Sequence, residues 1–204
     1  MAQSMREGIH TQSLDYINTN YDNELLEHLR ENIFHVTTIQ AYESIQRDGF
    51  IYSNKKDEYS INAGSQLSFG RHRGWVCLFD LREKSDKEIE ETLACYNFLR
   101  PRWFVKHWAD YSEWKLAYLL LSPQCYGYIV TKPSNDGTGY TQYIPQSECW
   151  YPEDLPFNCI QTVIQVNIHE QVQKDKPLLY ALHMIELEEQ NKKKGCQQVI
   201  PTIE

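Results

Sequence analysis

The amino-acid sequence predicts a single α+β domain, on three observations. The chain has 204 residues, a length that suits one domain or at most one and a half. Hydrophobic residues make up 41% of the chain, and five Trp, fourteen Tyr and seven Phe supply enough bulk for a core. Apolar runs of strand length outnumber helical patterns in the middle of the chain, and the helical patterns occur at intervals.

The N-terminal part of the chain passes from a polar segment to a helix and then to a strand. Residues 1–22 are polar and rich in Asn and Ser, so we expect them to be irregular and the domain to occupy residues 23–204. Residues 24–30 carry three leucines on one helical face, which predicts a short helix. The apolar residues 33–36 predict a short buried strand.

A second helix is predicted directly after this strand. Thr37 and Gln40 have the spacing of a capping box, and Gly49 is suited to end the helix in the left-handed conformation. Residues 50–52 then predict a strand. Residues 53–74 show no periodicity and are rich in Asn, Ser, Lys, Gly and Asp. A loop of this length inside a compact domain is often functional, so we expect a lid or a substrate loop.

The central part of the chain combines a strong strand with a capped helix. Residues 75–79 form a continuous apolar run, which is typical of a central strand. Ser85 and Glu88 form a second capping box, which begins a helix that Pro101 ends. Residues 102–121 are aromatic, and we expect them to be part helix and part strand.

The C-terminal part predicts three strands and a final helix. Residues 126–130 and 148–151 are apolar runs of strand length, and residues 160–168 alternate between apolar and polar positions. Pro177 is placed at the first turn of a helix that Gly195 ends. This helix completes the α+β pattern.

Charge and hydropathy limit the classes of partner. The chain has 28 acidic and 20 basic residues and a net charge of −8, which argues against sequence-independent binding to nucleic acid. A local basic cleft, for example around Arg71 and Arg73, stays possible. No apolar run approaches the ~20 residues of a membrane span, and the polar N-terminus does not resemble a signal peptide. We therefore expect a cytoplasmic protein that does not bind membranes.

The six cysteines predict neither a zinc site nor a disulfide framework. They show no Cys-x-x-Cys pair and no metal-ligand spacing, so we expect no bound metal. Reduced and mostly buried thiols are typical of cytoplasmic proteins.

Two polar residues next to apolar strands are the first candidates for chemistry. His35 lies within an early strand, and it either offers a ring nitrogen to a ligand or bonds to a backbone carbonyl as a core histidine. Glu148 begins a late strand, and it either lies at the floor of a cleft or is exposed at the strand end. The two lie about half the chain apart, so they meet only if the chain folds into one compact sheet.

A second set of candidates precedes the strand at residues 75–79. The guanidinium groups of Arg71 and Arg73 suit diphosphate oxygens, although solvated loop arginines are equally common. Aromatic residues of the middle region are suited to stack on a base or a nicotinamide, but aromatic side chains more often belong to a core.

Two longer motifs resemble the ADP-ribosyltransferase superfamily. Residues 34–38 read FHVTT, and DGFI follows at 48–51 after a helical stretch. This arrangement resembles the opening motif of the branch that contains the DarT-type DNA ADP-ribosyltransferases and the RNA 2′-phosphotransferases. Residues 148–160 read ECWYPEDLPFNCI and resemble the same branch's motif that begins with the catalytic Glu. The two motifs cover about a sixth of the chain.

The resemblance implies a fold and a set of binding residues. It implies two small packed sheets, mixed or antiparallel, that form an NAD-binding split, with peripheral helices and a C-terminal helix. Glu148 would be the catalytic residue, and His35 and Thr37 would bind the adenosine ribose. Arg71 or Arg73 would bind the diphosphate. Ser68 supplies the hydroxyl near the middle motif, where Phe69 has none, and no residue matches the Tyr or Ser-Thr-Ser of that motif.

The resemblance also implies the reaction. We expect an NAD-dependent mono-ADP-ribosyltransferase that cleaves the nicotinamide–ribose bond, with NAD as its substrate and a nucleic acid or protein as acceptor. A toxin or phage-defence effector with an antitoxin or immunity partner fits this class. The alternatives are an NAD glycohydrolase, a catalytically silent module that binds a nucleotide or protein, and an interaction protein without a cofactor.

Overall fold

Six strands form the main sheet, and two further strands form a small second sheet. The computed structural model describes residues 9–16, 22–53, 68–95, 114–132, 143–144 and 146–168. The strand order in the main sheet is β1-β8-β5-β2-β4-β6, and β3 pairs with β7 in the small sheet. The chain is therefore a small α+β domain with two sheets.

Three neighbouring strands of the main sheet, β1, β8 and β5, are longer than the other strands. The main sheet contains β1 (His10–Tyr16), β2 (Ile33–Thr38), β4 (Val76–Asp80), β5 (Trp114–Leu121), β6 (Glu148–Tyr151) and β8 (Ile160–Ile168). The small sheet contains β3 (Phe50–Ile51) and β7 (Leu155–Pro156). The helices are α1 (Asp22–Leu29), α2 (Ile39–Asp48), α3 (Phe69–Arg73) and α4 (Asp86–Cys95), with 3₁₀ turns η3 (Pro123–Tyr128) and η4 (Phe157–Cys159).

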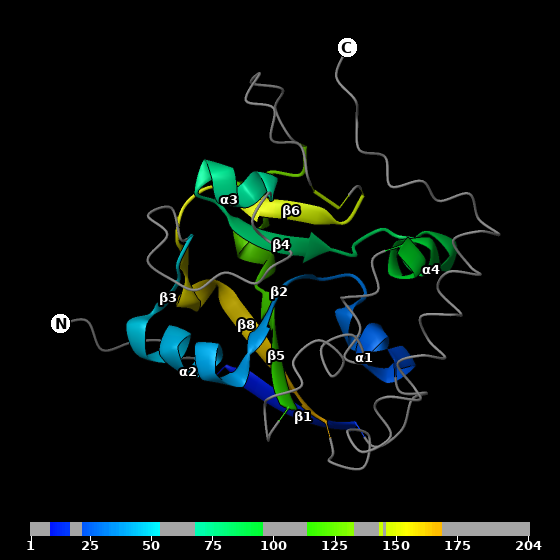
Figure 1. Cartoon of the computed structure of the whole chain (residues 1–204), viewed down its shortest axis with the longest axis horizontal. Helices are drawn as coiled ribbons and strands as arrows, with labels where there is room; N and C mark the ends of the chain where they lie inside the picture. The colour runs from blue at the N-terminus through cyan, green and yellow to red at the C-terminus, as the bar shows by residue number, and fades with distance from the viewer. Residues whose placement is uncertain are drawn as a thin grey trace.

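The main sheet changes direction between β2 and β4. Strand β2 pairs with β5 from Phe34 to Thr38, but with β4 only at Ile33 and Phe34. In Figure 1, β4 and β6 run across the upper part of the view, while β5, β8 and β1 lie below them. Strands β2 and β4 thus part directly before His35.

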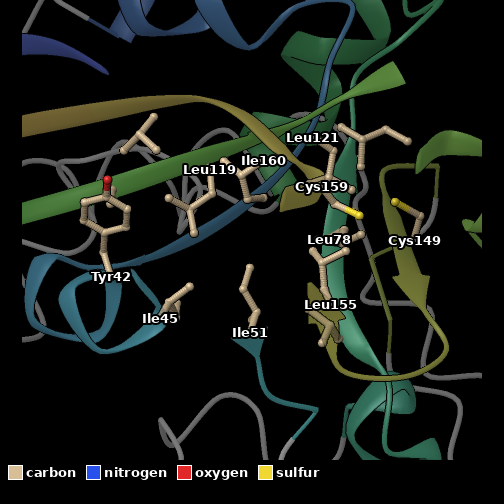
Figure 2. Close-up of a cluster of buried hydrophobic side chains, with 14 residues drawn as sticks. Tyr42, Ile45, Ile51, Leu78, Leu119, Leu121, Cys149, Leu155, Cys159 and Ile160 are labelled. Atoms are coloured by element: carbon tan, nitrogen blue, oxygen red, sulfur yellow. The ribbon is translucent and has the colours of Figure 1, made fainter. Parts of the chain in front are cut away.

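Two apolar clusters cover the two faces of the sheet. The first contains residues from α2, β3, β7 and one face of the main strands, among them Tyr42, Ile51 and Leu119, and is drawn in Figure 2. The second contains Leu25 and Leu29 of α1 and the strand residues whose side chains point to the other face of the sheet. Because side chains alternate along a strand, neighbouring residues such as Tyr118 and Leu119 belong to different clusters.

Most of the predicted elements are confirmed. The helix at 24–30 corresponds to α1, and the strands at 33–36, 50–52, 75–79, 148–151 and 160–168 correspond to β2, β3, β4, β6 and β8. Gly49 ends α2 with φ 81°, and its N–H donates to the carbonyl of Ile45. The capping box of α4 is formed, because the Ser85 N–H donates to the Glu88 carboxylate at 2.9 Å.

The cap of α2 is shifted by one residue from the predicted position. The hydroxyl of Thr38, and not that of Thr37, accepts the N–H of Ala41 at 3.2 Å. Thr37 stays in β2, where it pairs with Ala117 of β5. The ladder to β5 therefore decides where the strand ends, and the helix starts one residue later.

Two segments that were expected to be irregular contain regular structure. Within residues 1–22, His10–Tyr16 forms β1, which runs parallel to β8 at the edge of the sheet. His10, Thr11 and Ser13 are exposed on this edge strand, so their side chains can be polar, and this explains the missing apolar signal. Within residues 53–74, Phe69–Arg73 forms the helix α3, which Gly74 ends in the left-handed conformation.

The strand predicted at 126–130 is wrong. Residues Pro123–Tyr128 form a 3₁₀ turn, and only Val130 makes a bridge, to Trp150. Pro123 fixes the first φ of the turn, and the N–H of Ser122 donates to the carbonyl of Cys159 at 2.7 Å. In the predicted mixed region 102–121, Trp114–Leu121 is the strand β5. Pro101, the rest of that region and the predicted C-terminal helix lie outside the described residues.

Candidate functional site

Glu148 begins β6 with both carboxylate oxygens bound to donors. Oε2 accepts the backbone N–H of Ile144 at 2.8 Å, and Oε1 accepts the indole N–H of Trp150 at 3.0 Å. The Glu148 N–H donates in turn to the Ile144 carbonyl at 2.9 Å. The carboxylate therefore has a fixed orientation and is not a mobile group at a strand end.

The environment of Glu148 acts on its pKa in two directions. Burial raises the pKa of the carboxyl above its ordinary value, because the charged form loses hydration. The N–H of Ile144, the indole N–H of Trp150 and the thiol of Cys77 oppose this rise, since all three donate to the charged form. These donors keep a partly buried carboxylate available as a negative charge or a proton acceptor.

His35 lies on β2 at the first position beyond the ladder with β4. Its Nδ1 lies 3.0 Å from the carbonyl oxygen of Cys77. Burial lowers the pKa of His35, so the imidazole is neutral at pH 7. With the carbonyl as partner, Nδ1 carries the proton, and Nε2 is left as a hydrogen-bond acceptor.

Cys77 connects the two candidate residues. Its carbonyl contacts His35, and its thiol hydrogen-bonds the carboxylate of Glu148. Ser68 Oγ lies 3.4 Å from the sulfur, and the backbone of Arg71 also hydrogen-bonds it. Burial and the neighbouring Glu148 raise the pKa of Cys77 to about 12, so it acts as a neutral donor and not as a nucleophile.

The two candidates reach Cys77 from different directions. In the register of β4 and β6, Phe79 pairs with Glu148, and in the register of β2 and β4, Phe34 pairs with Phe79. Alternation therefore places Phe34 on the face of Glu148 and His35 on the opposite face of β2. Because β2 turns away from β4 at this point, the imidazole lies against the β4 backbone and the carboxylate against the Cys77 side chain.

The remaining predicted residues lie on β2, on α3 or directly before α3. Ser68 precedes α3 and belongs to the Glu148 cluster through Cys77. The guanidinium carbon of Arg73 lies 5.2 Å from the ring centre of Phe69 and 5.3 Å from that of Trp75. Arg71 reaches the cluster through its backbone, and Thr37 lies two residues beyond His35 on β2.

Phe69 is a core residue. It is 2% exposed, and its ring centre lies 4.8 Å from that of Trp150. The ring centres of Trp75 and Tyr143 lie 5.9 Å and 6.4 Å from that of Phe69. Phe69 thus supports the indole that holds Glu148, and it does not present a face to a ligand.

Three residues of the site have no functional signal in the sequence. Cys77 and Trp150 lie inside apolar runs that predict only strands, and Gly70 lies in a segment without periodicity. A Cβ on Gly70 would lie 2.7 Å from both the Cys77 sulfur and the indole nitrogen of Trp150. The spacing of Glu148 and Trp150 predicts only that their side chains share one face of the strand.

Other site chemistries find no support in the described part of the chain. Its His, Cys, Asp and Glu side chains form no group of three or more that is suited to a metal ion. The cysteines at 77, 125, 149 and 159 are free thiols. Within the same residues, no helix has the length and apolar character that crossing a membrane requires.

Comparison with known proteins gives no relative. Neither a family model, nor a curated protein, nor a solved structure matches this chain.

Proposed function

We propose that this protein is an NAD-dependent mono-ADP-ribosyltransferase with Glu148 as its catalytic residue. One observation carries the proposal. His35 and Glu148, which belong to the two resembling motifs and lie over half the chain apart, both contact Cys77, in the strand between theirs. They do so where the ladder between β2 and β4 ends, and the superfamily resemblance implies that NAD would bind between two sheets.

Glu148 would act on the ribose that carries the nicotinamide. Positive charge develops on this ribose as the glycosidic bond breaks, and a carboxylate with a fixed orientation stabilises that charge. If the carboxylate lies ~4 Å from the charge on the ribose, at an effective dielectric of 20, the interaction is worth about 4 kcal/mol, or roughly three decades in rate. The same carboxylate is suited to accept the proton of the acceptor nucleophile.

The other residues would bind the remaining parts of NAD. The neutral imidazole of His35, with Nε2 as acceptor, suits a hydroxyl of the adenosine ribose, and Thr37 follows on the same strand. Arg71 and Arg73 on α3 supply positive charge for the diphosphate. Ser68 would act through Cys77, by completing the donors around the Glu148 cluster.

The decisive experiment is release of nicotinamide from labelled NAD by the purified protein. We expect the wild-type protein to release it and Glu148→Gln to be slower by about a thousandfold, because the amide lacks the charge that the reaction needs. Glu153→Gln makes the same chemical change at an exposed position five residues later and serves as the control. Circular dichroism and melting temperature check that both variants fold.

The fate of the ADP-ribose separates the proposed transferase from its alternatives. After incubation of NAD labelled in the adenylate part with a cell lysate, label on DNA, RNA or protein supports a transferase and identifies the acceptor class. Nicotinamide release without labelled macromolecule indicates an NAD glycohydrolase. Binding of NAD without release indicates a silent nucleotide-binding module. Absence of any binding at millimolar NAD would contradict the proposal.

A further inference from the structure

We propose that Trp150 is a positioning residue, whose indole N–H sets the orientation of the Glu148 carboxylate for the reaction. This inference rests on the transferase activity proposed above. The indole nitrogen donates to Oε1 at 3.0 Å, and the Ile144 N–H donates to Oε2 at 2.8 Å. Two donors on two different oxygens fix the rotation of the carboxylate plane, which a single donor would leave free.

The indole itself is held in place by its surroundings. Trp150 is fully buried, and its ring packs against Phe69 and Tyr143 with centre distances of 4.8 Å and 5.8 Å. Its backbone exchanges two hydrogen bonds with Val130, at 2.9 Å and 3.0 Å. Gly70 lies against the edge that carries the nitrogen, where even a methyl group has no space. The donor is therefore preorganised before any substrate binds.

An indole is well suited to this position. Its nitrogen is a donor only and does not ionise, so it cannot take the proton that Glu148 would accept. A hydrogen bond to a charged group contributes about 1.5–3 kcal/mol, which corresponds to roughly one to two decades in the population of the oriented, ionised form. Loss of this bond would reduce the rate and not the binding of NAD.

Among the described residues, two thiols of β4 and β6 are the titratable groups nearest to Glu148 whose pKa is shifted. The thiol of Cys77 faces it from β4, whereas Cys149, the next residue on β6, points to the opposite face and lies in the first apolar cluster. Burial raises the pKa of both thiols, for Cys77 to about 12 and for Cys149 well above its usual range. Both stay neutral at the pH values at which Glu148 titrates, so a titration in this cluster reports on Glu148.

The first test is the variant Trp150→Phe, which removes the N–H and keeps an aromatic ring. We expect kcat for nicotinamide release to fall about tenfold with little change in the Kd for NAD. The pKa of Glu148, measured by carbon NMR of the side-chain carboxyl, should rise, and the acid limb of the pH–rate profile should move to higher pH by the same amount. Trp75→Phe is the matched control, because it removes another indole that contacts Phe69 and leaves the bond to Glu148.

The second test needs no substitution in the site. In the wild-type protein the Trp150 indole N–H resonance should shift with pH along the titration of Glu148, since protonation weakens the bond. A resonance that does not respond would overturn the proposal, as would an unchanged pKa and acid limb in Trp150→Phe. If the wild-type protein releases no nicotinamide, the proposed function fails, while the indole titration still decides whether Trp150 orients Glu148.

Discussion

His35 makes the stability of this protein sensitive to acid. Burial lowers the pKa of the imidazole in the folded protein, whereas the unfolded chain has the ordinary value of about 6.5. Above this value the ring is neutral in both states, and its contact with Cys77 contributes fully. As the pH falls below it, the unfolded chain takes up a proton that the folded protein excludes, and stability is lost.

We therefore predict that His35→Gln flattens the pH dependence of stability. The amide keeps a donor for the Cys77 carbonyl and removes the titration. Between pH 7 and pH 5 the wild-type protein should lose stability relative to the variant, by at most about 1.4 kcal/mol per pH unit. Urea unfolding of both proteins at pH 5, 6 and 7 measures this difference. A difference that stays constant with pH would show that the folded protein protonates His35 as readily as the unfolded chain.

The sequence allowed some of the site residues to be identified and not others. His35 and Glu148 are polar residues in apolar surroundings, so each requires a partner or a function, and the pattern draws attention to both. Cys77 and Gly70 act through contacts between strands and α3, which no local pattern contains, whereas Trp150 donates to Glu148 two residues earlier on its own strand. The core position of Phe69 could not be predicted for the same reason, since its neighbours come from three segments.

At the scale of elements, the packing of α3 on β6 supports the site. Gly70 is the contact point, because a Cβ there would lie 2.7 Å from the Trp150 nitrogen and from the Cys77 sulfur. Both atoms belong to the cluster around Glu148. Helix and strand can approach this closely only because position 70 lacks a side chain.

We predict that Gly70→Ala destabilises the protein and impairs the site. Overpacking a filled core typically costs about 1–3 kcal/mol, and here the strain falls on the donor of Glu148. Gly127→Ala is the matched control, since a Cβ at Gly127 meets no atom within 4 Å. Its effect should stay within about 0.5 kcal/mol. Urea unfolding and nicotinamide release compare the two variants, and equal effects would contradict the role assigned to Gly70.

The elements that the sequence predicted correctly are those with a local cause. The capping box at Ser85 and the glycine at 49 act within a few residues of themselves, and both are found in the structure. The elements that were missed depend on distant partners. Strand β1 exists because β8 pairs with it, and the tight turn at Pro123–Tyr128 is tied to η4 through the carbonyl of Cys159.

At the scale of the whole molecule, the sheet makes one unit from distant segments. Its central strand β5 pairs on one side with β2, which carries His35, and on the other with β8. Strand β1 extends the sheet beyond β8, and it brings Ile9 to the first apolar cluster and Leu14 to the second. Residues 9–16 therefore contribute to both apolar clusters of the sheet.

This arrangement predicts that deletion of residues 1–16 destabilises the whole domain. The deletion removes the β1–β8 ladder and the apolar contacts of Ile9 and Leu14, which together should cost about 3 kcal/mol. The substitution Leu14→Ala, which removes packing alone, should cost about 1 kcal/mol, and Ser13→Ala at an exposed position of β1 should cost almost nothing. Urea unfolding measures all three. If the deletion leaves both the free energy of unfolding and its dependence on urea unchanged, the domain starts after residue 22, and β1 is an accessory strand without a part in the stability of the site.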